Sequence, residues 1–207
     1  MIRLKTLLTE ATAVNPSFVA YIKDQEGSKK NEKGQHVAYL DKVPAKPLWT
    51  IGYGHTGADV KSGLVWSETK ATTQLENDIR SAEKAVKTYI DSNFGPTQLN
   101  QTQLEMLVDF AFNGGIGILK KFPSFTKAVV NLDWPTIKKE FVRYSGGKRL
   151  GKRNDDFETR FITPNLNSKK TTFKDVKTAL KNSGVDYTDP ELQTRLEKGP
   201  PKWYDFK

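Results

Sequence analysis

The chain has 207 residues, of which 36% are hydrophobic and 28% are charged, and its formal net charge at pH 7 is +9. This composition is typical of a soluble globular protein, and it excludes a disordered chain or one built from long apolar membrane spans. The absence of cysteine excludes disulfides and thiol chemistry, and with only two histidines we expect neither a metal nor another cofactor.

The first 14 residues form an N-terminal amphipathic segment rather than a signal peptide. Lys5 interrupts its leucines and Glu10 ends the apolar stretch. A secretory signal needs a continuous apolar region. We therefore expect synthesis in the cytoplasm without a signal peptide, so that any action outside the cytoplasm depends on another factor for release.

A helix is predicted to follow, from Asn15 to about Glu26. Asn15 is a helix-capping residue, and Pro16 is suited to the first helical position. Residues 28–35 are polar and turn-forming, and they lead into a β segment from about residue 36 to 55. Its middle, 43–47, contains two prolines and is interpreted as the loop joining two strands.

The rest of the chain is predicted to be mainly helical. Apolar residues recur every three or four positions from about residue 68 to 92, which indicates one long amphipathic helix. A second pattern, from Leu104 to Ala111, ends at Asn113-Gly114-Gly115. Further helices are predicted near 124–131, 135–144 and 154–162, and two short ones near 173–182 and 190–197 in a polar, lysine-rich C-terminal extension over 163–207.

Two carboxylates and a hydroxyl in the N-terminal part of the chain suggest a hydrolytic site. Cleavage of a glycosidic bond requires one carboxyl group as proton donor and a second that attacks the sugar or activates water. Glu26 ends an apolar helix, where partial burial would keep its carboxyl protonated near neutral pH. Asp41 would remain ionised and hold the water, and Thr50 would help to position it. Taken singly, each residue also has an ordinary structural interpretation.

These residues stand in an ordered set of motifs that resembles the phage-type lysozymes of glycoside hydrolase family 24. The motifs are Glu26-Gly27, Tyr39-x-Asp41, Thr50-Ile51-Gly52-Tyr53-Gly54-His55-Thr56, Phe110-Ala111-Phe112-Asn113-Gly114-Gly115-Ile116-Gly117 and Phe122-Pro123-Ser124-Phe125. The resemblance continues through residues 147–161 and covers about 15–162. It offers no counterpart for residues 163–207.

The resemblance implies an endolysin-type muramidase that hydrolyses the β-1,4 linkage between N-acetylmuramic acid and N-acetylglucosamine in peptidoglycan with inversion. It implies Glu26 as the general acid, with Asp41 and Thr50 positioning the attacking water. Gly54, Phe112 and Asn113 match substrate-contacting positions, although Phe112 and Asn113 also suit a core position and a helix end. The resemblance further implies a structural role for His55, and it leaves open whether Arg153 or Arg160 approaches the acid.

Two spacings depart from the family pattern. Glu26 and Asp41 are 15 positions apart and Asp41 and Thr50 are 9 apart, which implies insertions at 28–36 and 43–47. Long loops cost little free energy. The insertions nevertheless weaken the assignment of Asp41, and Asp24 and Glu32 are the nearest alternative acids.

From these observations we expect a mainly α, α+β lysozyme-like fold in two lobes, with a small β-hairpin lobe and a helical lobe joined by the long helix. The domains would be the segment 1–14, a catalytic domain over 15–162, and an accessory extension over 163–207. The partners would be peptidoglycan glycan strands in the cleft and an anionic cell envelope attracted by the net charge. We expect a monomer acting on the host cell wall or periplasm.

Three alternatives remain open at this point. A lytic transglycosylase would use one acid and no water, and the presence of both Asp41 and Thr50 favours hydrolysis instead. A wall-docking lysozyme module of a phage tail would retain the same motifs. Nucleic-acid binding would suit the charge, but the lysines are scattered and no recognition motif or long basic helix is present. We therefore expect no nucleic-acid partner. Since no apolar run is long enough for a membrane span, we also expect no transmembrane segment.

Overall fold

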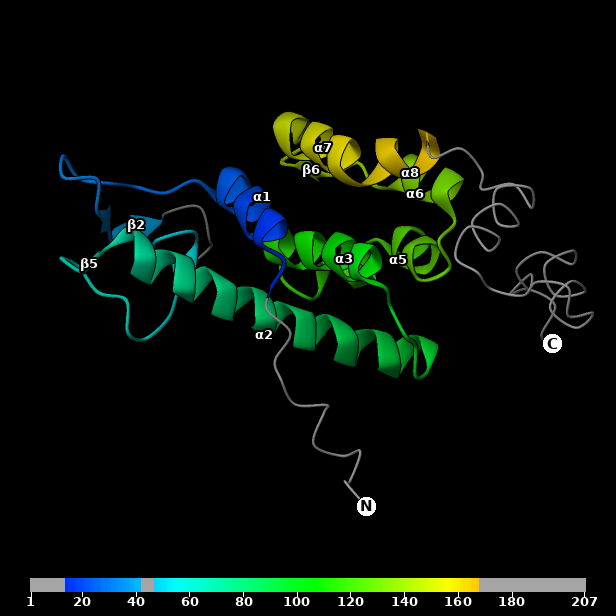
Figure 1. Ribbon diagram of the computed structural model, residues 1–207, viewed down its shortest axis with the longest axis horizontal. Coiled ribbons are helices and arrows are strands. Elements are labelled where there is room, and N and C mark those ends of the chain that lie inside the picture. The colour runs from blue at the N-terminus through cyan, green and yellow to red at the C-terminus, as the bar shows by residue number, and fades with distance from the viewer. Residues whose placement is uncertain (1–13, 42–46, 168–207) are drawn as a thin grey trace, which may run out of the picture. The chain divides into compact units, whose positions relative to one another are not determined.

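A computed structural model describes residues 14–41 and 47–167 of the chain. It is mainly helical with small antiparallel sheets, as predicted, and it divides into two compact units, one ending at Phe122 and the other beginning at Pro123 (Figure 1). Nearly all of the segment 1–14 lies outside the described residues, and so do the helices predicted at 173–182 and 190–197. The same is true of most of the predicted loop at 43–47.

Helix α1 (Pro16–Glu26) has the boundaries that the sequence predicts. The Asn15 side chain accepts a hydrogen bond from the backbone N–H of Ser17, which satisfies one of the free donors at the helix start. The helix ends at Gly27, whose φ of +61° lies in the region that favours glycine. Glu26 is consequently the last helical residue.

The β region of the first unit contains five short strands: β1 (His36–Val37), β2 (Tyr39–Asp41), β3 (Leu48–Ile51), β4 (His55–Thr56) and β5 (Val65–Trp66). Strands β2, β3 and β4 form an antiparallel sheet in that order, and β2 and β3 flank the predicted loop. Strand β1 pairs with β5, which lies outside the predicted β segment. The predicted segment is therefore confirmed but incomplete.

A small hydrophobic core supports these strands. Ile51, Val60, Trp66 and Ala71 are buried together, and Ala71 already belongs to the following helix. Gly52 has φ +63°, and a Cβ there would lie 3.4 Å from the Trp66 ring. Only glycine therefore suits this bend, which directs the chain from β3 toward β4.

Two longer helices complete the first unit. Helix α2 (Glu68–Phe94) confirms the predicted long helix, and the Ser67 side chain caps its first turn. Helix α3 (Gln101–Gly114) begins with a capping box between Asn100 and Gln103. Helix α2 starts beside the β strands and continues along α3, against which it packs (Figure 1). A single-turn helix, α4 (Ile118–Lys121), follows α3.

The second unit contains α5 (Pro123–Val130), α6 (Trp134–Glu140), β6 (Tyr144–Ser145), β7 (Lys148–Arg149), α7 (Gly151–Phe157), the π-helical turn η2 (Glu158–Ile162) and α8 (Thr163–Asn167). Three aromatic rings pack against Phe157 with centroids 4.9–5.9 Å apart: Phe141 is stacked on it, Phe125 is edge-on and Phe161 is tilted.

Two sequence predictions in this unit were wrong in their bounds. The helix predicted over 135–144 ends at Glu140, and a hairpin follows whose turn is Gly146-Gly147. Both glycines have positive φ, as the central residues of a type I′ hairpin turn require. The helix predicted over 154–162 begins earlier, at Gly151, and its second half is π-helical.

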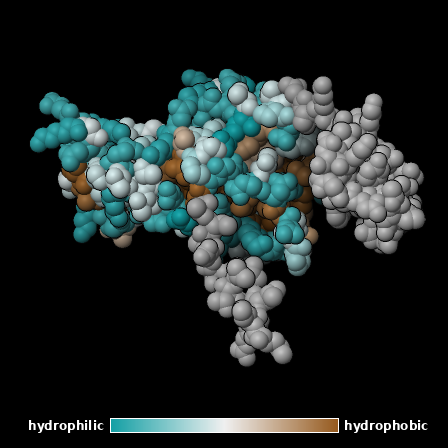
Figure 2. All heavy atoms as spheres, viewed as in Figure 1, coloured by the Kyte–Doolittle hydropathy of each residue, from teal (hydrophilic) through white to brown (hydrophobic). Residues whose placement is uncertain are grey.

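None of the helices in the described part of the chain combines the length and the hydropathy needed to cross a membrane. In the view of Figure 2, hydrophilic residues and residues of intermediate hydropathy cover most of the visible β region, with a small hydrophobic patch at its edge. Among the described residues of the first unit, most large apolar side chains are buried, and the exposed ones are Leu40, Leu48, Val65, Phe94 and Ile116.

Candidate active site

Glu26 lines a pocket of about 300 Å³ in the first unit. Its neighbours in the lining come from the β3–β4 connection and strand β4, from α2, and from the end of α3: Tyr53, Gly54, His55, Thr56, Asp78, Ala82, Ala111 and Phe112. Gly54 has φ +87°, and a Cβ there would lie 3.6 Å from Glu26 Oε2. The backbone thus approaches the carboxyl group closely, and Glu26 is only partly exposed to solvent.

Asp41 and Thr50 lie on one face of the β2–β3–β4 sheet. In the register of these strands Tyr39 is opposite Thr50, and Asp41 is opposite Leu48. Residues opposite each other, or two positions apart on a strand, point to the same face. Thr56 is opposite Thr50 on the other side and lines the pocket with Glu26. The face that carries Asp41 and Thr50 therefore continues to the pocket edge.

The pKa of the Tyr39 hydroxyl group depends on the charges of both Asp41 and Glu26. Burial raises the pKa of Tyr39, and the negative charges of Asp41 and Glu26 raise it further. Such an effect requires both carboxyl groups to be near this one hydroxyl. Glu26 and Asp41 both raise the pKa of this one hydroxyl, although they are 15 positions apart in the sequence.

Only some of the other predicted site residues line the pocket that contains Glu26. Gly54 and Phe112 line the pocket, whereas Asn113, next to the end of α3, is exposed and is absent from the lining. Asp41 and Thr50 are also absent from it. Thr50 is 4% exposed, and its hydroxyl donates to the carbonyl of Leu48 in its own strand at 3.4 Å, near the limit of a hydrogen bond.

Asp78 is a pocket residue that the sequence analysis missed. The ring nitrogen Nδ1 of His55 lies 2.9 Å from Asp78 Oδ2, and Gln74 donates to Asp78 Oδ1 at 3.0 Å. This pair links strand β4 to helix α2 on the pocket wall. The sequence does contain a signal for Asp78. It is a carboxylate at helical spacing from Leu75 and Ala82, and so it stands within the apolar stripe of α2.

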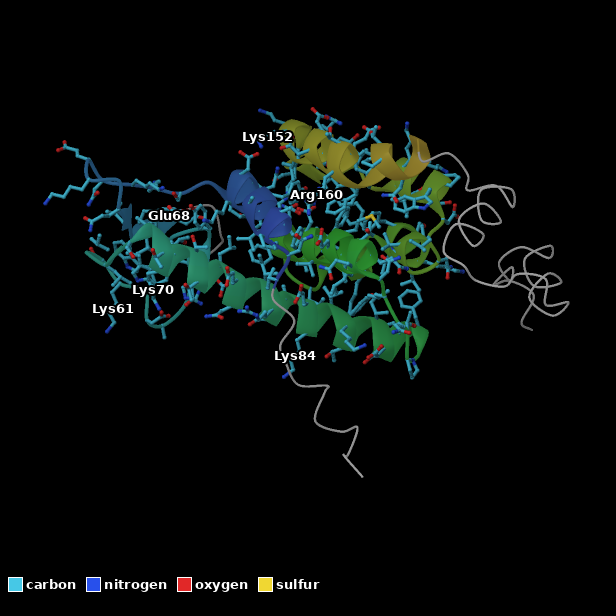
Figure 3. All side chains as sticks on the ribbon, in the orientation of Figure 1. Lys61, Glu68, Lys70, Lys84, Lys152 and Arg160 are labelled. Atoms are coloured by element: carbon cyan, nitrogen blue, oxygen red, sulfur yellow. The ribbon has the colours of Figure 1, made fainter. Side chains whose placement is uncertain are left out.

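Glu68, at the first position of α2, is the centre of a second polar cluster. Its Oε1 accepts hydrogen bonds from Lys23 Nζ at 2.9 Å and Tyr53 Oη at 2.6 Å, and its Oε2 accepts from Lys30 Nζ and His36 Nε2, both at 2.9 Å. We refer to Lys23, Lys30, His36, Tyr53 and Glu68 as the Glu68 network. Figure 3 shows Glu68 at the end of α2 that lies beside the β strands.

The contacts within the network shift the pKa values of Glu68 and Tyr53. Donation by Tyr53 and Lys23, and then by Lys30 and His36, holds the pKa of Glu68 well below its usual range, against the raising effect of desolvation. Burial, the hydrogen bond to Glu68 and its charge together raise the pKa of Tyr53 well above its usual value. Glu68 is therefore a carboxylate, and Tyr53 a neutral donor, near neutral pH.

We expect the stability contribution of Glu68 to depend on pH in one direction. Because its folded pKa is depressed, the contribution is complete above the unfolded carboxyl pKa of about 4.3 and is lost as the pH falls toward the folded pKa. The wild type should therefore melt at a higher temperature than Glu68→Gln at pH 7, and this difference should shrink steadily below about pH 4.3. A difference that stayed constant down to pH 2.5 would contradict the ionised network.

The described residues contain no group of three or more histidine, cysteine, aspartate or glutamate side chains arranged to hold a metal ion. The two histidines are each engaged with a carboxylate, His36 with Glu68 and His55 with Asp78.

Comparison with known proteins gives consistent matches. The chain is 33% identical over 140 residues to an endolysin of Bacillus phage B103, covering 65% of this chain and 51% of that protein. It is 32% identical over 114 residues to a SAR-endolysin of Haemophilus phage HP1, covering 55% and 54%. The chain thus spans about half the length of the curated relatives it matches.

A solved structure of the active form of the P1 phage endolysin Lyz superposes with a TM-score of 0.55 and 20% identity, over 77% of this chain and 90% of that one. This likeness confirms the predicted lysozyme-like fold. The family model described as Phage lysozyme matches residues 29–155, a range that includes Asp41 and Thr50 and begins three positions after Glu26. Because this match covers more than half of the 207 residues of the chain, the chain belongs to the phage lysozyme family.

Proposed function

We propose that this protein is an endolysin-type muramidase, which hydrolyses the β-1,4 linkage between N-acetylmuramic acid and N-acetylglucosamine in peptidoglycan. Family membership and the endolysin relatives support cleavage of the cell wall. The observation that carries the proposal is the position of Glu26 at the end of α1, in a pocket bordered by the sheet face that bears Asp41 and Thr50.

Glu26 acts as the general acid in this proposal. It donates its proton to the glycosidic oxygen, so the leaving sugar departs as a neutral alcohol while the muramic acid C1 develops positive charge. Its position in a pocket, next to the backbone of Gly54, reduces its contact with water.

Asp41 and Thr50 orient the attacking water. The water forms its bond to C1 from the side opposite the leaving oxygen, and Asp41 accepts the proton that it releases. A direct displacement of this kind inverts the anomeric centre. It requires a separation of roughly 6.5–9.5 Å between the carboxyl groups of Glu26 and Asp41, which leaves room for one water. The small Thr50 side chain leaves that room open.

The sugar is proposed to contact Gly54, Phe112 and Asn113. Gly54 offers backbone groups without a side chain in the way, and Phe112, from the end of α3, also lines the pocket. Asn113 is exposed at the next position, where its amide can bind a neighbouring sugar. We propose that the protein acts as a monomer on the host wall or periplasm and that the +9 charge favours an anionic envelope.

The products formed from purified peptidoglycan test this function. We expect mass spectrometry to show new fragments ending in a reducing N-acetylmuramic acid, because water supplies the new hydroxyl group. A Glu26→Gln sample under the same conditions serves as the control. Fragments ending in 1,6-anhydro-muramic acid would instead identify a lytic transglycosylase, in which the sugar's own hydroxyl replaces water, and would contradict the roles of Asp41 and Thr50.

A further inference from the structure

Glu68 connects segments that are far apart in the chain and that carry the proposed site. Lys23 belongs to the last turn of α1, three positions before Glu26, and Tyr53 directly precedes Gly54. His36 lies in β1, three positions before Tyr39, and Lys30 lies between α1 and β1. A single carboxylate on α2 thus binds α1, the β1 strand, and the β3–β4 connection at once.

The network is more constrained than an ordinary surface ion pair. An exposed pair usually contributes little, because both side chains remain mobile and water screens them. Here each carboxylate oxygen of Glu68 has two side-chain partners within 2.9 Å. Lys23 Nζ also contacts Thr72 Oγ1 at 2.6 Å. Although 48% of the Glu68 side chain is exposed, its partner His36 is fully buried.

The aromatic rings add rigidity to the same cluster. The His36 ring packs edge-on against the Tyr53 ring, with centroids 5.0 Å apart, and Lys23 Nζ lies 5.0 Å from the Tyr53 ring centroid. His36 Nδ1 is buried and has no hydrogen-bond partner within the part of the chain that the structure describes. Glu68 is therefore the group that fixes the orientation of this ring, and through it the position of Tyr53.

We propose that Glu68 is a positioning residue for the cleavage reaction, which holds the last turn of α1 and the Tyr53-Gly54 segment so that Glu26 is correctly placed in its pocket. The proposal rests on the function proposed above. Its physical basis is that catalysis is sensitive to small displacements, since misplacing a reacting group by about 1 Å can reduce the rate by about 10²-fold. Glu68 does not line the pocket and has no proposed contact with the sugar.

The main test is the effect of Glu68→Gln on kcat and KM with a soluble peptidoglycan oligosaccharide. Gln keeps the shape but loses the charge that holds the two lysines. We expect kcat to fall by about 10- to 100-fold and KM to change by less than about 2-fold, because the sugar contacts remain. The matched control is Glu76→Gln, two turns further along α2, whose carboxylate pairs with Arg80 of the same helix at 3.9 Å. It should retain wild-type kcat.

A double-mutant cycle with Lys23→Met separates positioning from a general loss of stability. If Glu68 acts on Glu26 through Lys23, the double variant should have nearly the same kcat as Glu68→Gln alone. If instead the two single substitutions reduce kcat independently, so that their fold-losses multiply in the double variant, the route through Lys23 is contradicted. Melting curves identify the folded variants, and if Glu68→Gln lacks a cooperative transition, Tyr53→Phe takes its place as the milder change and should lower kcat several-fold.

The proposal is overturned if Glu68→Gln, or Tyr53→Phe in its place, has wild-type kcat when folded, or if the loss appears only in KM. Failure of the proposed function gives a different result. In that case the wild type releases no muramic acid ends, or Glu26→Gln remains active. An active wild type, an inactive Glu26→Gln and a fully active Glu68→Gln would together retain the function and reject the positioning role.

Discussion

Glu26→Gln is expected to abolish glycan cleavage, with a loss in kcat of at least the roughly 10²–10⁴-fold that a general acid contributes. The amide has nearly the same shape as the carboxyl group but cannot donate its proton to the leaving oxygen. Because Glu26 is only partly buried at the end of α1, the melting temperature should change little. Release of reducing ends from peptidoglycan and a thermal melt measure the two effects on the same sample.

Asp24→Asn is the matched control for this experiment. Asp24 lies in the same final turn of α1 but two positions earlier, and residues two apart on a helix point in different directions. It is exposed and does not line the pocket. We expect Asp24→Asn to cleave at the wild-type rate, and a Glu26→Gln variant with half of the wild-type activity would reject Glu26 as the acid.

Asp41→Asn is expected to produce the second largest loss, of roughly 10²–10⁴-fold in kcat. The amide can still hydrogen-bond to water, but it cannot accept the proton that the water loses. The binding of the sugar should be less affected, so KM should stay within about 3-fold of the wild type. Initial rates over a range of oligosaccharide concentrations separate kcat from KM.

The control for Asp41→Asn is Glu32→Gln, an exposed acid in the turn between α1 and β1. Glu32 and Asp24 are the alternative acids that the long spacings in this region leave open. Full activity in Asp41→Asn, together with a large loss in either of the other two variants, would transfer the role of water activation to that residue.

The helices of the first unit were predictable because their signals are local. Asn15 caps α1 as its sequence suggests, Ser67 caps α2, and apolar residues at helical spacing define the buried faces. The β6–β7 hairpin also had a local signal in Gly146-Gly147, which was missed because the preceding helical pattern was extended through it. The π-helical turn at Glu158–Ile162 had no such signal, since its pattern is that of an ordinary helix.

The candidate site was predictable only in part. The sequence placed Glu26, Gly54 and Phe112 at positions that line one pocket, and strand alternation puts Asp41 and Thr50 on one face of a sheet. Asp78 and Glu68 were missed because their roles depend on long-range contacts, with His55 across 23 positions and with Lys23 across 45. No local pattern specifies such pairs.

The anomeric form of the first product tests the proposed reaction most directly. Proton NMR during the first minutes of cleavage, before the new reducing sugar equilibrates in water, distinguishes the α from the β anomer. If Glu26 protonates the leaving oxygen while Asp41 and Thr50 direct a water to the opposite face, the product must appear as the α anomer. Initial formation of the β anomer would show retention, which requires direct attack by a carboxylate or another two-step route, and would contradict the proposed roles of Asp41 and Thr50.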